Sequence, residues 1–188
     1  AHPYLDSVYE KVGMHSGKFR VEKVKWIVGK KSTRVSCHEW GCTFNVELGK
    51  VFFSPRLGTE RQRIAGEVKP DETIAVFFAG IGPFAIQLAK HAHAKKVFAL
   101  EWNPHAIPLL QENITQNKVE KVVRVFPGDV RKSVEHILGQ CSRVIMPAPE
   151  TALQYLPRAL EALSPSKGGW IHCYFFVPAD RMMHAALG

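Results

Sequence analysis

The sequence has few cysteines, and their scatter excludes a disulfide-rich or zinc-finger class. Only four of the 188 residues are cysteines, at Cys37, Cys42, Cys141 and Cys173. Cys37, His38 and Cys42 come nearest to a metal-binding pattern, but no second ligand pair follows at zinc-finger spacing. We therefore expect reduced thiols, no metal site and an intracellular compartment, the cytoplasm first, with the mitochondrion and the nucleus left open.

Long apolar runs are also missing. No stretch approaches the roughly 18 apolar residues that a membrane span requires, and the first residues lack the basic and hydrophobic segments of a signal sequence. We expect no membrane partner. The sequence starts at Ala1 and stops at Gly188 in the middle of its pattern of elements. Whether targeting segments lie outside it is left open.

Acidic residues are too few to balance the basic ones. The chain has 25 Lys and Arg against 17 Asp and Glu, a formal net charge of +8. This excess fits a polyanionic partner such as RNA, although charge alone leaves open a soluble protein that is simply basic. The length allows one full-sized domain with a small appendage, which we expect to be monomeric.

The order of the expected elements predicts an α/β protein. Residues 1–53 favour a small antiparallel β-rich domain, and residues 54–188 favour a doubly wound, mostly parallel sheet with helices on both faces. In the first domain we expect a short helix at 8–12 and strands at 19–28, 34–38, 43–48 and 51–53. In the second we expect strands near 73–78, 97–101, 122–126, 143–146 and 170–177, and helices at 59–68, 83–94, 104–117, 131–138 and 150–163. The first of these helices carries a capping-box pattern from Thr59 to Gln62.

One stretch indicates a nucleotide-like cofactor. A buried strand leads into Gly80-x-Gly82-x-x-Ala85 and a helix, and Glu101 ends the next strand about twenty residues later, where such folds hold a ribose. Pro83 removes a backbone N–H that a pyrophosphate would need. The residues therefore favour S-adenosylmethionine over a dinucleotide, and a glycine-rich turn that binds nothing stays open.

Three segments resemble the archaeal and eukaryotic tRNA (guanine-37 N1)-methyltransferases. They are residues 53–61 (FSPRLGTER), 78–84 (FAGIGPF) and 103–106 (NPHA), and Lys18, Phe19 and Arg20 fit as well. The combination is specific and the similarity covers nearly the whole chain. It implies a class I, Rossmann-like methyltransferase domain fused to an RNA-facing domain, with S-adenosylmethionine as methyl donor and N1 of guanosine 37 of tRNA as acceptor.

The resemblance also implies the site residues. Those expected to line the cofactor are Arg56, Phe78, Gly80, Gly82, Glu101, Trp102, Asp129, Val130 and Pro147, with Glu101 on the ribose hydroxyls and Asp129 and Val130 beside the adenine. Glu60 would be the general base that takes the N1 proton. Arg20 would stabilise the negative charge that develops on O6. The residues alone favour an ordinary first-turn carboxylate for Glu60 and a solvated strand residue for Arg20, and only the resemblance favours the catalytic roles.

Two positions depart from the family pattern. Val76 stands where an acidic residue is usual, and Pro147-Ala148-Pro149 replaces Asn-Leu-Pro. About five of the usual seven strands are expected, which predicts a truncated C-terminus. Two alternatives therefore stay open: the related wybutosine-pathway enzyme, which transfers the aminocarboxypropyl group of the same cofactor, and a catalytically impaired RNA-binding relative.

Overall fold

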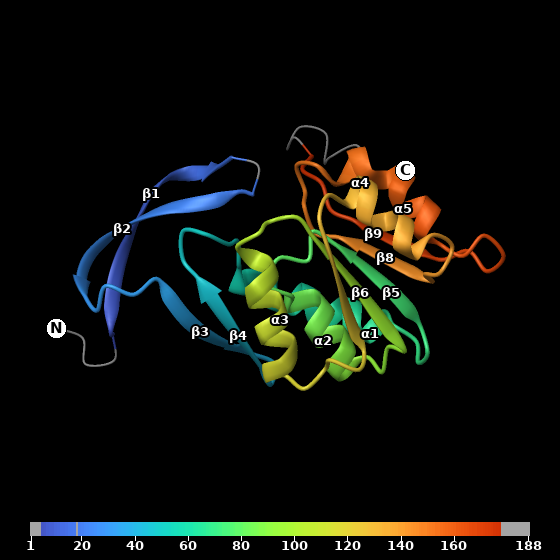
Figure 1. Cartoon of the computed structure of the whole chain (residues 1–188), viewed down its shortest axis with the longest axis horizontal. Helices are drawn as coiled ribbons and strands as arrows, with labels where there is room; N and C mark the ends of the chain where they lie inside the picture. The colour runs from blue at the N-terminus through green and yellow to red at the C-terminus, as the bar shows by residue number, and fades with distance from the viewer. Residues whose placement is uncertain (1–4, 18, 178–188) are drawn as a thin grey trace, which may run out of the picture.

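A five-stranded parallel sheet forms the centre of the protein, in the computed structural model that describes residues 5–17 and 19–177 (Figure 1). Its strand order is β7-β6-β5-β8-β9. The strands are β5 (Thr73–Phe77), β6 (Lys96–Glu101), β7 (Val123–Pro127), β8 (Arg143–Met146) and β9 (Trp170–Cys173). From β5 the chain adds β6 and β7 on one side and then β8 and β9 on the other. The topological switch point therefore lies between β5 and β8. The expected fold class is confirmed. Predictions that fall on residues 1–4, Lys18 and residues 178–188 lie outside the described residues.

Helices cover both faces of this sheet. Residues Ile74 and Val76 point into one hydrophobic cluster, together with α1 (Gly58–Glu67), α2 (Pro83–His91) and α3 (Ala106–Gln116). Ala75 and Phe77 point into a second cluster on the other face. That cluster includes α4 (Val130–Ser133), the 3-10 turns η2 (Val134–Ile137) and η3 (Ala152–Tyr155), and α5 (Leu156–Ala162). The three inner strands β5, β6 and β8 are buried on both faces, as expected for a parallel sheet.

A β-hairpin is attached to the first face through α3. Strands β3 (Arg34–Glu39) and β4 (Cys42–Glu47) pair antiparallel, as predicted. Asn113 of α3 and Asn117, the C-cap residue of that helix, bond to β4 in place of a neighbouring strand. Asn117 accepts from the Thr43 N–H (2.9 Å) and donates to the Thr43 carbonyl (2.7 Å), and Asn113 makes the same pair of bonds to Asn45 (2.7 and 3.2 Å). The backbone groups along this edge of β4 are therefore satisfied without another strand.

A buried ion pair joins the hairpin to α1. Arg61 is 2% exposed, and its guanidinium donates to both carboxylate oxygens of Glu39 (2.7 and 2.6 Å) and to the Ser54 carbonyl (3.0 Å). Gln87 of α2 donates to the same carboxylate (2.5 Å). The guanidinium also lies 5.6 Å from the centroid of Phe53 and 5.7 Å from that of Phe84. One side chain thus ties the hairpin to α1 and to the loop that precedes it.

The remaining hairpin stands apart from the body of the molecule (Figure 1). Strands β1 (Ser7–Ser16) and β2 (Val21–Gly29) pair with each other only. The strand predicted at 19–28 is confirmed, but the helix predicted at 8–12 is wrong. Val8, Tyr9 and Val12 favour an extended chain, and pairing with β2 supplies the backbone bonds that a five-residue helix could not.

Three other local predictions are wrong. Residues 51–53 form a bend and extended chain outside any strand, with Phe53 packed 5.8 Å from Phe44. The capping box does not form, because the 3-10 turn η1 (Pro55–Leu57) starts the helix early and Leu57 becomes its N-cap. The helix predicted at 150–163 is shorter: its first part is the 3-10 turn η3, α5 starts only at Leu156, and the small residues Ala159 and Ala162 face the sheet while Leu153 and Leu160 are exposed.

Within the described part of the chain, no helix has the length and apolar character needed to cross a bilayer. No group of three or more His, Cys, Asp and Glu side chains is placed to hold a metal ion in that same part. The four cysteines are free thiols.

The Glu39–Arg61 pair gives a prediction about stability. Glu39→Ala should lower the free energy of unfolding by about 3–5 kcal/mol, because it leaves the Arg61 guanidinium buried without its carboxylate. Glu161→Ala breaks the exposed pair between Arg158 and Glu161 on α5 and should cost at most about 1 kcal/mol. Urea denaturation of both variants measures the difference, and equal losses would contradict the structural role of the buried pair.

Candidate active site

The carboxyl ends of four neighbouring strands bring most of the predicted cofactor residues to one edge of the sheet. Phe78, Gly80 and Gly82 follow β5, Glu101 and Trp102 end β6, Asp129 and Val130 follow β7, and Pro147 follows β8. The Gly128 N–H donates to the Glu101 carbonyl (2.8 Å), which joins the exits of β6 and β7. In doubly wound folds this edge, beside the switch point, is where ligands bind.

The glycine-rich loop after β5 has the backbone shape that its sequence predicts. Phe78, Gly80 and Gly82 have φ values of 55°, 58° and 96°. A Cβ atom on Gly82 would lie 2.5 Å from Leu110 Cδ1 and 2.9 Å from Ile86 Cδ1. Gly82 is therefore required for packing as well as for the turn. Gly80 has more room, since the nearest atom to such a Cβ would be 3.8 Å away.

Glu101 holds this loop against β6. Its carboxylate is almost fully buried and accepts from the backbone N–H groups of Gly80 (2.6 Å), Trp102 (2.9 Å) and Asn103 (2.6 Å). Burial raises the pKa of Glu101, and the three N–H bonds act in the opposite direction. The residue predicted to bind a ribose thus also shapes the loop, which the sequence spacing did not indicate.

Asp129 and Val130 have different environments. Asp129 is the N-cap of α4 and accepts from the Arg131 backbone N–H (2.9 Å), and the Arg131 guanidinium lies against the same carboxylate. Val130 is buried in the second hydrophobic cluster. Any contact from Val130 to a bound molecule would therefore come from its backbone.

Aromatic rings flank the same edge. Phe78 contacts Tyr155 edge-to-face, with centroids 4.9 Å apart. Trp102 contacts Phe19 in the same manner at 6.1 Å, which brings the turn between β1 and β2 to the end of β6. Pro147 is half-buried, whereas Arg56 is exposed on η1.

The two predicted catalytic residues reach this side of the protein from different elements. Arg20, at φ 52°, forms an ion pair with Glu150 in the loop after β8. Glu60 lies in the first turn of α1, as predicted, and contacts Arg63 and Tyr174. Tyr174 follows β9 and its N–H donates to the Met146 carbonyl (3.4 Å). Both residues therefore lie near the carboxyl ends of β8 and β9, each with a partner that sequence reasoning missed. The spacing of Glu60 and Arg63 on one helix face was readable, but the contacts to Glu150 and Tyr174 carried no local signal.

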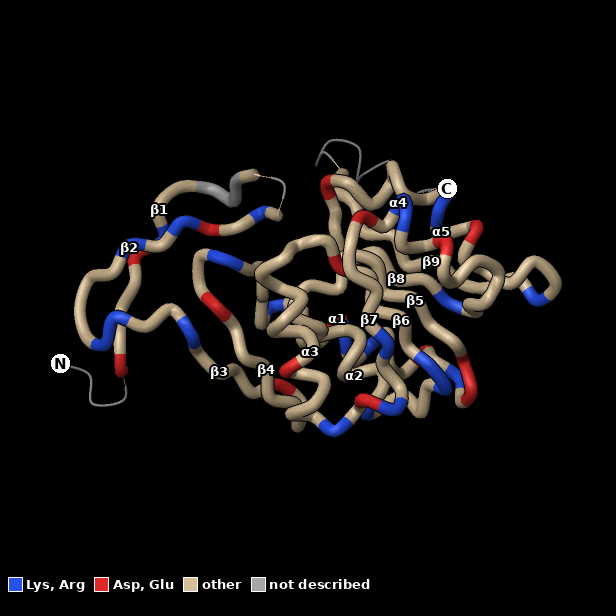
Figure 2. The backbone as a smooth tube through the Cα atoms, viewed as in Figure 1, with Lys and Arg blue, Asp and Glu red and all other residues tan. Residues whose placement is uncertain are grey.

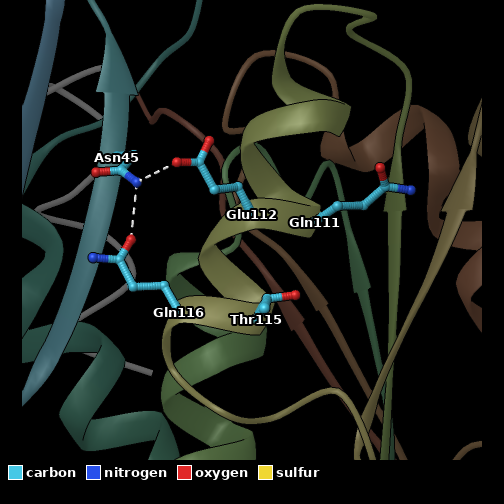
Figure 3. Close-up of a pocket in the computed structure, with 5 residues that line it drawn as sticks. All are labelled: Asn45, Gln111, Glu112, Thr115 and Gln116. Carbon is cyan, nitrogen blue, oxygen red and sulfur yellow. Dashed lines mark hydrogen bonds between the residues drawn. The ribbon is translucent and has the colours of Figure 1, made fainter.

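The protein also has a surface hollow outside the candidate site. Asn45, Gln111, Glu112, Thr115 and Gln116 line it, between β4 and the second half of α3 (Figure 3). Asn45 donates to Glu112 (2.7 Å) and Gln116 (2.8 Å) across it. Since α3 runs back along the sheet from the end of β6, this shallow hollow lies away from the candidate site.

The similarity to known proteins covers most of the chain. The family model for the TRM5/TYW2 methyltransferase domain matches residues 35–187. The tRNA (guanine(37)-N(1))-methyltransferase Trm5b of Pyrococcus abyssi is 38% identical over 94% of this chain and 51% of its own length. The chain thus spans about half of this relative.

Solved structures give the same result. A complex of aTrm5 with tRNALeu has a TM-score of 0.82 at 34% identity, covering 96% of this chain and 52% of that one. TYW2 of P. horikoshii with MeSAdo has a TM-score of 0.78 at 30% identity, covering 86% and 59%. The resemblance inferred from residues 53–61, 78–84 and 103–106 is confirmed: the chain belongs to the TRM5/TYW2 methyltransferase domain family.

Proposed function

We propose that this chain carries the catalytic part of a tRNA methyltransferase that moves a methyl group from S-adenosylmethionine to N1 of guanosine 37. The observation that carries the proposal is the joint placement of the FAGIGPF loop and Glu101 at the switch point, with Glu60 and Arg20 on the same side. Relatives named for this activity and a neighbour solved with tRNA support it.

The cofactor fits the residues at the edge of the sheet. S-adenosylmethionine has no phosphate, so Pro83 at the start of α2 is no obstacle. Glu101 has one oxygen, Oε2, that accepts only one N–H bond, which leaves capacity for one ribose hydroxyl. Neighbours in this family were crystallised with AdoMet and with adenosine.

The chemistry assigns distinct roles to the two catalytic residues. The N1 atom of guanine becomes nucleophilic only when its proton leaves, and the Glu60 carboxylate accepts that proton. As N1 attacks the methyl carbon, the sulfur keeps the electrons of the bond that breaks. Arg20 donates to O6 while negative charge develops there.

The RNA-facing part of the proposal rests on residues 1–53. Lys23 and Lys25 are exposed on β2, and Figure 2 shows basic residues along this hairpin. Phe19 and Arg20 place the end of the hairpin beside the candidate site. We infer that this hairpin contacts the tRNA backbone next to the methylated base, that residues 54–188 form the methyltransferase domain, and that the protein is a monomer acting in the cytoplasm.

A second candidate is aminocarboxypropyl transfer from the same cofactor. It is favoured by the similarity to TYW2 of P. horikoshii, which was solved with MeSAdo. The product separates the two reactions, since methyl transfer leaves S-adenosylhomocysteine and aminocarboxypropyl transfer leaves methylthioadenosine.

The first test is methyl transfer itself. The protein should move label from S-adenosylmethionine to tRNA with guanosine at position 37, and not to the same tRNA with adenosine there, because adenine has an amino group where Arg20 would need the O6 acceptor. Isothermal titration with S-adenosylmethionine should show binding. Binding without transfer, or neither, would support the impaired relative to which Val76 and Pro147 point.

The second test concerns the general base. Glu60→Gln should lower the single-turnover rate by about 100- to 10,000-fold, the range for loss of a general base, while cofactor binding is retained. Glu161→Gln is the matched control, because Glu161 pairs with Arg158 three residues away just as Glu60 pairs with Arg63. A rate for Glu60→Gln equal to that of the control would remove Glu60 from the mechanism.

A further inference from the structure

The carboxylate of Glu60 has hydrogen-bond partners on both oxygens. Oε1 accepts from the Tyr174 hydroxyl (2.5 Å) and from Arg63 Nη2 (2.7 Å). Oε2 accepts from Arg63 Nε (2.7 Å). A carboxylate has about four lone-pair sites, so these three bonds leave one site on Oε2 that can accept the proton of the guanine N1–H.

The two partners differ in how firmly they are held. Tyr174 is half-buried, its ring packs against the first hydrophobic cluster with its centroid 6.2 Å from that of Phe84, and its backbone is bonded to β8. The Arg63 side chain is 52% exposed, and its second partner, Glu67, is 44% exposed. Arg63 can therefore leave without disturbing the core, whereas Tyr174 cannot.

We propose that Tyr174 is a positioning residue: it anchors Oε1 of Glu60 and so directs the remaining lone pair of Oε2 at the target guanine. The inference rests on the proposed function. In the reaction, Oε2 takes the N1 proton, the N1 lone pair forms the bond to the methyl carbon, and the carbon–sulfur bond electrons go to sulfur. The proton then passes from Glu60 to solvent.

Arg63 also lowers the basicity of the Glu60 carboxylate. Arg63 holds the pKa of Glu60 below its usual range, and the Tyr174 hydroxyl and the charges of Arg63 and His172 add to this effect, while burial opposes it. Burial and the charge of Arg143 in turn lower the pKa of His172. Removal of Arg63 therefore raises the pKa of Glu60 and makes the carboxylate a stronger base.

The kinetic test uses two variants with opposite expectations. Tyr174→Phe should lower the single-turnover rate at saturating tRNA by about 10- to 100-fold, since a misdirected base loses that much. Arg63→Gln should raise that rate, because the Glu60 carboxylate becomes a stronger base without the guanidinium. Arg158→Gln is the matched control for Arg63→Gln. A tenfold loss in Arg63→Gln, or no loss in Tyr174→Phe, would overturn the assignment.

A second measurement does not depend on methyl transfer. Urea midpoints of Tyr174→Phe, Glu60→Gln and the double variant form a cycle, and the double variant should lose less than the sum of the single losses, because both single changes remove the same contact. Additive losses would show that the contact is absent and overturn the inference while the proposed function stands. A coupled cycle in a protein that methylates no tRNA would instead overturn the proposed function, and the positioning role with it.

Discussion

The buried guanidinium of Arg61 fixes the geometry on which the candidate site depends. It joins Glu39 of β3 to the Ser54 carbonyl and lies between the rings of Phe53 and Phe84. These contacts hold the first turn of α1, and Glu60 is the preceding residue of that turn. A buried ion pair is weak evidence for stability as such, because desolvation offsets much of the attraction. The Glu39–Arg61 pair instead fixes a position: the five donors of a planar guanidinium define where the helix begins better than apolar contacts do.

Glu101, the last residue of β6, likewise fixes the local geometry of the candidate site. Three backbone N–H groups converge on its carboxylate, so the end of β6 and the glycine-rich loop share one acceptor. A carboxylate offers about four lone-pair sites, and only one remains for a ligand. The same residue therefore shapes the loop and keeps limited capacity for a hydroxyl. A neutral amide at this position would offer half the acceptor sites, which explains why the fold uses a carboxylate despite the burial that raises its pKa.

Local patterns predicted most of the secondary structure, whereas contacts between residues distant in the sequence could not be predicted. Alternation of strands and helices indicated the parallel sheet, and the spacing of Gly80, Gly82 and Glu101 indicated the edge where we place the cofactor. The strand predicted at 51–53 failed because its apolar residues pack against β4 instead of pairing. The short run at 8–12 was ambiguous until β2 was available as a partner. Tyr174 could not be connected to Glu60, because 114 residues separate them and no pattern links a strand end to a helix start.

Val76 and Pro147 both depart from the family pattern, but they lie in different environments. Val76 is fully buried among apolar neighbours of the first hydrophobic cluster, where even a neutral polar group without a partner would cost about 2–7 kcal/mol and an ionised carboxylate far more. The surroundings therefore suit valine, and its effect on the cofactor is indirect. Pro147 is half-buried at the carboxyl end of β8, in the loop that also carries Glu150, the partner of Arg20. A proline there offers a carbonyl and no donor. Any group that an asparagine amide would have bonded at this position therefore lacks that partner. Because Arg20 contacts the loop after β8 and the Tyr174 backbone contacts β8 itself, the geometry of that loop affects the distance between Arg20 and Glu60, the two residues that we propose for catalysis.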